Sequence, residues 1–227
     1  MPMIVRLCTT IVMSALFLSP IGAEAKKAKC PIDLKKKYQS RLEQAEAIVS
    51  GKKSGKIPDL YDLANVVGLY PSCWKNPAAP LERMVAILDI QYKGKANSVW
   101  SKGLNQLGYE YMKQKKYKDA ARTYEKLVSL IEAKRKSRGG DLYSVASDME
   151  RPALGLFRAQ WFGKNYAGAE SAALTLLAIR KAKLAGGYKY ARRVKGTYRT
   201  LAKVYEKMGQ QAKADEMRRK EKAVKGE

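Results

Sequence analysis

The chain has 227 residues and a formal net charge of +24, because 45 lysines and arginines face only 21 acidic residues. It contains no histidine. This excludes Ser-His-Asp and Cys-His catalysis, histidine-ligated zinc and the usual acid–base group near neutral pH. We therefore expect no cofactor and no metal ion.

Residues 1–25 have the pattern of a cleaved export signal. A positively charged start is followed by a mostly apolar run over residues 7–18, a Ser-Pro break and the small residues Ala23 and Ala25. The apolar run, about 12 residues, is short of the roughly 20 that span a membrane. Because Lys26 and not a cysteine follows, a lipoprotein is disfavoured. We expect cleavage before Lys26 and a periplasmic or secreted mature protein.

The two cysteines left after cleavage, Cys30 and Cys73, flank two predicted helices over residues 33–49 and 59–70. An antiparallel pair would place the start of the first helix beside the end of the second. In an oxidising compartment this predicts a Cys30–Cys73 disulfide, which would stabilise the fold by about 4 kcal/mol. Two free thiols are the alternative. Two cysteines cannot complete a tetrahedral sulfur site for a metal.

A third helix is expected to begin near Pro80, since proline suits the first helical turn. Residues 26–96 would then form an N-terminal helical cap or a degenerate first repeat.

The stretch over residues 100–134 shows the clearest pattern of the chain. Apolar residues recur three and four positions apart, which predicts two consecutive helices with one buried stripe each. The polar run 113–116 suits a tight turn between them. Small residues, Gly108 and Ala120, would let the two backbones approach closely.

This stretch resembles the tetratricopeptide repeat (TPR). The residues that match the pattern of the repeat are Leu107-Gly108, Tyr111, Ala120 and Tyr124. Leu104 stands where the family often has tryptophan, and the closing proline is missing. A second copy near the C-terminus follows the same order, with Tyr198, Leu201-Ala202, Tyr205, Gly209, Gln211 and Ala214. A weaker copy lies between these two, with Leu156, Trp161, Asn165-Tyr166, Ala169 and Leu176.

The three equivalent alanines, at positions 120, 169 and 214, are 49 and 45 residues apart. Both spacings exceed the roughly 34 residues of the standard repeat, so the helices should be longer and similar to the repeats of kinesin light chains. The resemblance implies an all-α fold, a right-handed superhelical stack of antiparallel helix pairs. Residues 97–227 would hold about three such pairs.

Two features of the repeats predict breaks in the helices. Pro152 interrupts a long helix that Asp141 can cap, so we expect a kink or a restart there. The charged tail from Met217 onward is expected to fray.

The resemblance also implies a binding groove, lined by the first helix of each repeat. Aromatic and basic residues at its exposed positions suit an extended acidic peptide. The expected groove residues are Lys102, Asn105, Tyr109, Met112, Lys113, Arg158, Arg199, Lys203 and Lys207.

These observations favour a non-enzymatic protein–protein interaction scaffold of the bacterial cell envelope with an acidic protein partner. An exported chain meets little nucleic acid, so no nucleic-acid partner is expected. The first alternative is a structural protein that is retained on anionic envelope polymers or lipid headgroups through its overall charge. The second is a cell-wall-cleaving enzyme, suggested only by the pair Glu170-Ser171.

Overall fold

The computed structural model describes residues 32–93, 95, 97–187 and 189–224. Its regular structure there consists of nine α-helices and one short 3-10 helix, without a strand. The all-α prediction is confirmed. The elements are α1 Ile32–Val49, α2 Leu63–Leu69, η1 Pro71–Cys73, α3 Ala78–Tyr92, α4 Ser98–Lys113, α5 Tyr117–Ser137, α6 Leu142–Phe162, α7 Tyr166–Ala185, α8 Ala191–Lys207 and α9 Gln211–Ala223.

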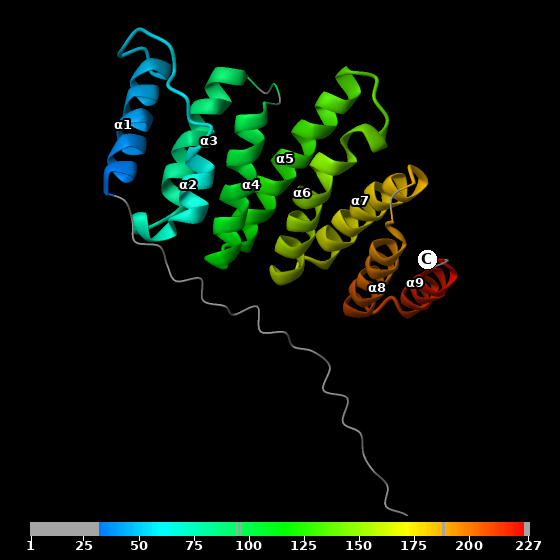
Figure 1. Cartoon of the computed structure of the whole chain (residues 1–227). Helices are drawn as coiled ribbons and strands as arrows, with labels where there is room; N and C mark the ends of the chain where they lie inside the picture. The colour runs from blue at the N-terminus through cyan, green and yellow to red at the C-terminus, as the bar shows by residue number, and fades with distance from the viewer. Residues whose placement is uncertain (1–31, 94, 96, 188, 225–227) are drawn as a thin grey trace, which may run out of the picture.

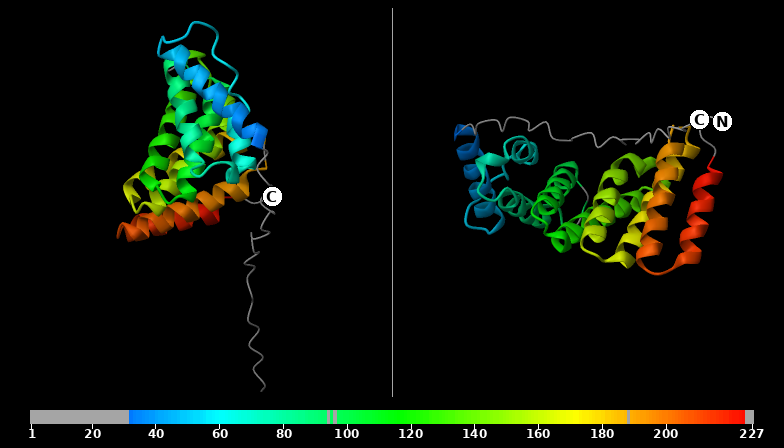
Figure 2. Two further views of the ribbon diagram at one scale, coloured as in Figure 1. Left: turned by 90° about the vertical axis from the view of Figure 1, so that its left-hand side faces the viewer. Right: turned by 90° about the horizontal axis from the view of Figure 1, so that it is seen from below.

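The helices form a right-handed stack of antiparallel pairs, with α1 at one end and α9 at the other (Figure 1). Each helix from α3 to α9 packs mainly on its neighbours in the chain. The view from below shows the row of pairs from α1 to α9 (Figure 2). The predicted solenoid is therefore correct, and its core is spread along the stack instead of being gathered at one centre.

Three hairpin turns of the same construction join the helices of the pairs α4–α5, α6–α7 and α8–α9. Each has a left-handed residue at its centre, Lys115, Lys164 or Gly209, with φ of 59°, 60° and 72°. In each turn, the residue that follows the left-handed one donates its backbone N–H to the carbonyl of the residue five positions before it, with N···O distances of 2.8–2.9 Å. The alanine five residues after each left-handed centre is fully buried. The repeat is thus visible in the backbone as well as in the sequence.

Buried apolar side chains form two large clusters. The first extends from Tyr38 in α1 to Ile179 in α7. It therefore includes residues on both sides of position 96, where the N-terminal cap was predicted to end. The second joins α7, α8 and α9 around Leu201. The N-terminal helices α1–α3 therefore share a core with the first repeat pair, while α8 and α9 share the second core with α7.

Two predicted helix boundaries differ in the N-terminal part. Residues 61–62 form a turn, and the Tyr61 N–H donates to Asp59 Oδ1 at 2.8 Å, so α2 begins only at Leu63. The helix expected near Pro80 begins at Ala78, which leaves the proline inside the first turn, where its missing N–H breaks no bond.

The expected restart at Pro152 is wrong, because α6 continues through it to Phe162. Pro152 is buried, and α6 packs along both α5 and α7, which compensates for one lost backbone hydrogen bond. Fraying from Met217 is also wrong as far as Ala223. Met217 is buried in the second core, and Arg218 forms ion pairs with Glu206 and Asp215.

Candidate partner-binding groove

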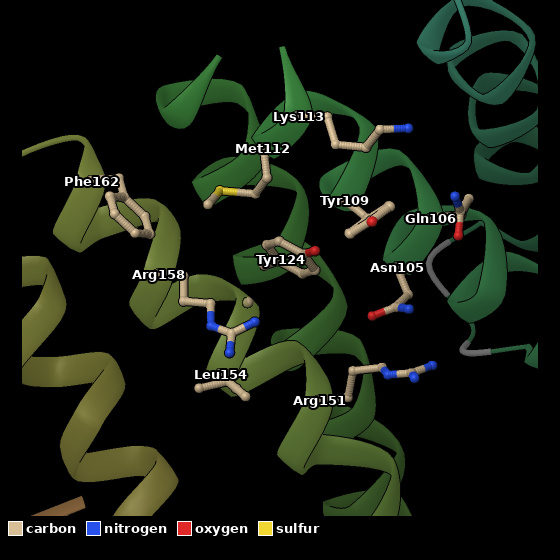
Figure 3. A pocket seen from close by; sticks show the side chains of 11 residues that line it. Asn105, Gln106, Tyr109, Met112, Lys113, Tyr124, Arg151, Leu154, Arg158 and Phe162 are labelled. Atoms are coloured by element: carbon tan, nitrogen blue, oxygen red, sulfur yellow. The ribbon is translucent and has the colours of Figure 1, made fainter. Parts of the chain in front are cut away.

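A hollow of about 820 Å³ lies between α4 and α6, with one residue of α5 at its base (Figure 3). We call it the α4–α6 pocket. Such a volume accommodates several side chains of a partner. The pocket is lined by Asn105, Gln106, Tyr109, Met112, Lys113, Tyr124, Arg151, Leu154, Gly155, Arg158 and Phe162.

The base of the pocket is the ring of Tyr124, which is inserted between two helices at two glycines. A Cβ atom at Gly108 of α4 would lie 2.8 Å from the ring, and one at Gly155 of α6 only 2.5 Å from it. Both contacts are closer than side chains tolerate, so glycine is required on either side. Burial raises the pKa of Tyr124 to about 12, so its hydroxyl stays protonated.

Gly155 was not predicted from the sequence, because the position equivalent to Gly108 in the second repeat is Phe157. The pair Leu154-Gly155 has the same residue types as Leu107-Gly108, but it follows that pair by 47 residues and not by the 49 that separate Ala120 from Ala169, so the repeat register does not point to it. The glycine of the second repeat faces back toward α5, and this allows α6 to approach Tyr124 closely.

The charge of the lining is entirely positive. Lys113, Arg151 and Arg158 enter the pocket, and none of its lining residues is acidic. Lys113 pairs with the buried Glu110 at 3.0 Å. Arg151 and Arg158 are exposed and have no hydrogen-bond or ion-pair partner within the described part of the chain. Two unpaired guanidinium groups in one hollow favour a ligand that carries carboxylates or other oxyanions.

Five of the predicted groove residues line this one pocket. Tyr109 is 52% exposed, and the Lys113 ammonium lies 5.5 Å from its ring centroid. The Asn105 Oδ1 is buried without a donor among the described residues. The five are Asn105, Tyr109, Met112, Lys113 and Arg158. Their role in binding remains a prediction.

Lys102 lines a second hollow of about 480 Å³, which shares Asn105 and Arg151 with the first. Its ammonium lies 4.0 Å from the ring centroid of Tyr61. Lys134 adds another cation there, and Asp148 is the acidic residue in the lining. Together the two hollows form a trough along α4 and α6.

The predicted groove residues of the last repeat lie elsewhere. Arg199 and Lys203 line a separate hollow between α8 and α9, and Arg199 is paired with Glu221 at 2.6 Å. Lys207 is exposed in the last turn of α8. The predicted groove is thus not one surface from the first repeat to the last.

The predicted disulfide and cleavage residues fall at the edge of the described structure or beyond it. Cys73 ends η1 and is buried, with 4% of its surface exposed. Cys30 and the cleavage residues Ala23, Ala25 and Lys26 lie outside the described residues. The pairing and the cleavage stay predictions.

Glu150 of α6 is the centre of a buried ionic cluster that the sequence analysis did not identify. Its carboxylate accepts hydrogen bonds from Arg180 (3.1 Å) and Lys183 (3.2 Å) of α7, from Arg193 of α8 (2.8 Å) and from the Tyr190 hydroxyl (2.9 Å). Burial alone would raise the pKa of Glu150, but hydrogen bonds from Arg193, Tyr190, Lys183 and Arg180 outweigh it and hold the pKa at about 2. The cluster joins α6, α7 and α8 near the boundary of the two cores.

Of the pair Glu170-Ser171 considered for catalysis, the glutamate has a structural partner. Glu170 accepts a hydrogen bond from the Tyr205 hydroxyl at 2.8 Å, which connects α7 to α8. Over the described ranges, no three acidic or cysteine side chains are close enough to hold a metal ion. Of the helices described, none combines the length and the apolar character that crossing a membrane requires.

Neither family models nor curated proteins match the chain. Solved structures do match the chain. Two crystal structures of a Podosopora anserina kinesin light chain with nearly identical TPR-like repeats, one of them a point variant, are similar with a TM-score of 0.54. Their sequence identities are 17% and 16%, and the similarity covers 85% of this chain and 92% of theirs. The fold is therefore a TPR-like helical repeat stack.

Proposed function

We propose that this protein is an exported, non-enzymatic interaction scaffold of the bacterial cell envelope that binds an acidic segment of a partner protein. The binding surface is the α4–α6 pocket. The export pattern of residues 1–25 supports the location, and the stacked repeats support the role, because such stacks offer extended surfaces to other proteins.

One observation carries the proposal. Arg151 and Arg158 enter the same pocket as Lys113. The lining has no carboxylate, and among the described residues neither arginine has a hydrogen-bond or ion-pair partner. Other cations of the chain, such as Arg83 and Arg180, are paired with acids. A guanidinium that is left unpaired in a concave site can bind a carboxylate through two parallel hydrogen bonds. The exposed ring of Tyr109 beside them adds the kind of contact that dominates protein interfaces.

The test begins with a photoreactive amino acid at Tyr109 in the protein expressed in its native cell. A matched protein carries it at Tyr143, an aromatic residue of similar exposure that is not in the pocket lining. We expect a protein crosslinked from position 109 and not from position 143, with an acidic segment at the crosslink.

Calorimetry with the identified partner then measures the contribution of single residues. Tyr109→Ala should cost about 2 kcal/mol if the ring is a hot spot, and Arg158→Glu should weaken binding and flatten its salt dependence. Arg192→Glu changes the net charge equally at an exposed residue of α8 and should have little effect.

The retention alternative predicts a different result. If Arg192→Glu weakens binding as much as Arg158→Glu, and isolated anionic envelope polymer binds both variants equally, diffuse charge explains the protein better than the pocket does.

A further inference from the structure

The Tyr124 side chain passes between α4 and α6, and its hydroxyl lies at the base of the α4–α6 pocket. At both Gly108 and Gly155 the tyrosine atom nearest to an added Cβ would be Cζ, the carbon that bears the hydroxyl, at 2.8 Å and 2.5 Å. The two glycines therefore flank the outer end of the ring, and the oxygen extends beyond it. Tyr124 lines the pocket although only 5% of its surface is exposed (Figure 3).

This hydroxyl has no hydrogen-bond partner among the described residues. It also differs from the fully buried polar atoms that lack a partner, such as Asn105 Oδ1, because it stays accessible from the pocket. The hydroxyls of buried tyrosines usually bond to another group of the protein, as that of Tyr205 does with Glu170 at 2.8 Å. A phenylalanine would fill the gap between the two glycines equally well, so packing does not explain the hydroxyl.

Two guanidinium groups act on the same hydroxyl. Burial raises the pKa of Tyr124, and the positive charges of Arg158 and Arg151 oppose the rise, so the hydroxyl is a donor at neutral pH with both cations near it. Both arginines line the pocket, and neither has a partner within the described part of the chain. A carboxylate can accept hydrogen bonds from a hydroxyl and from guanidinium groups together. The three side chains thus offer one oxyanion a matching set of donors.

We propose that the base of the α4–α6 pocket is a carboxylate subsite, in which the Tyr124 hydroxyl donates a hydrogen bond to one acidic side chain of the partner while Arg151 and Arg158 flank it. The subsite rests on the proposed function and adds to it a specificity residue that the repeat pattern assigns to packing alone. A neutral donor at the base of a hollow contributes nothing to long-range attraction. It therefore favours an inserted carboxylate over anions that the net charge holds loosely at the surface.

The variant Tyr124→Phe tests the subsite, because it removes the hydroxyl and keeps the ring and the net charge. The probes are fluorescein-labelled, C-terminally amidated Gly/Ser peptides that contain either glutamates or glutamines, and fluorescence anisotropy with the mature protein gives their affinities. We expect Tyr124→Phe to bind the glutamate peptide about tenfold more weakly, since a hydrogen bond to a charged group is lost. The salt dependence should stay unchanged, whereas Arg158→Gln should weaken binding and flatten it.

A glutamine peptide with a free C-terminus separates a side-chain carboxylate from a terminal one. We expect it to bind no more tightly than the amidated glutamine peptide. Binding as tight as that of the glutamate peptide, with the same loss in Tyr124→Phe, would overturn the assignment to an acidic side chain.

Tyr205→Phe is the matched control, because its hydroxyl has a partner in Glu170 and does not line the pocket. This variant should lower the midpoint of urea unfolding and leave peptide binding unchanged. Tyr124→Phe should show the reverse, with weaker binding and an unchanged midpoint, since its hydroxyl bonds to no described residue of the unbound protein.

The outcomes separate the subsite from the proposed function. If Tyr124→Phe binds the glutamate peptide as tightly as the unaltered protein, or loses stability as Tyr205→Phe does, the subsite is wrong. The acidic-segment function still stands in that case if Arg158→Gln weakens binding and Arg192→Gln does not. A glutamate peptide that binds no better than the glutamine peptide, or that binds Arg158→Gln and Arg192→Gln equally, would overturn both.

Discussion

Glu150→Gln is expected to destabilise the protein strongly. The Glu150 carboxylate is 10% exposed and is surrounded by Arg180, Lys183 and Arg193. Its pKa of about 2, against an ordinary value near 4.5, corresponds to roughly 3 kcal/mol of stabilisation in the ionised form. The amide would leave three cations without their common counter-ion. Urea unfolding at neutral pH should show a free energy of unfolding lower by about 3 kcal/mol.

The pH dependence gives an independent measure of the same quantity. Because the folded pKa of Glu150 is depressed, its contribution is complete above the unfolded value near 4.5 and is lost as the pH falls toward 2. Between pH 5 and pH 2 the unaltered protein should therefore lose more stability than Glu150→Gln does. The control is Glu125→Gln, which removes the same charge from an exposed residue of α5. Equal losses in the two variants, or parallel pH profiles for Glu150→Gln and the unaltered protein, would refute the reasoning.

The remaining predictions concern packing and processing. Gly155→Ala should cost about 1–3 kcal/mol of unfolding free energy, because its Cβ would collide with the tyrosine ring between α4 and α6. In contrast, Gly196→Ala, at a helical glycine with open space around it, should stabilise by up to about 1 kcal/mol, and a loss there would contradict the packing argument. Mass spectrometry of the exported protein should find Lys26 at the N-terminus and one peptide linking Cys30 to Cys73; full-length chain or alkylatable thiols would contradict these expectations.

The repeat architecture could be predicted from the sequence because it depends on local features. The three-and-four spacing of apolar residues defines each helix, and polar residues or glycine at a left-handed position define each turn, as at Lys115 and Gly209. The fully buried Ala120, Ala169 and Ala214 mark equivalent positions in three turns of the stack. Each of these signals acts within a few residues, so no tertiary information is needed to read them.

Part of the groove was predictable for a similar reason. On a first helix, the positions that do not pack in the stack are exposed, and Tyr109 and Lys113 at such positions line the α4–α6 pocket. The same rule does not hold for Arg199 and Lys203, which do not line a pocket of this kind. Such a pocket needs the first helices of two successive repeats as its walls. No repeat follows α9 among the described residues, so these side chains meet α9 instead.

Contacts between three helices were decided only by the tertiary structure. Glu150 meets Arg180 and Arg193 because α6, α7 and α8 converge there, and their separations of 30 and 43 positions carry no local signal. The insertion of Tyr124 between two glycines likewise depends on how closely α4 and α6 approach it. The sequence determines which face of each helix is apolar. How far neighbouring helices are apart, and therefore which charged side chains share a pocket, follows from the packing of these long repeats as a whole.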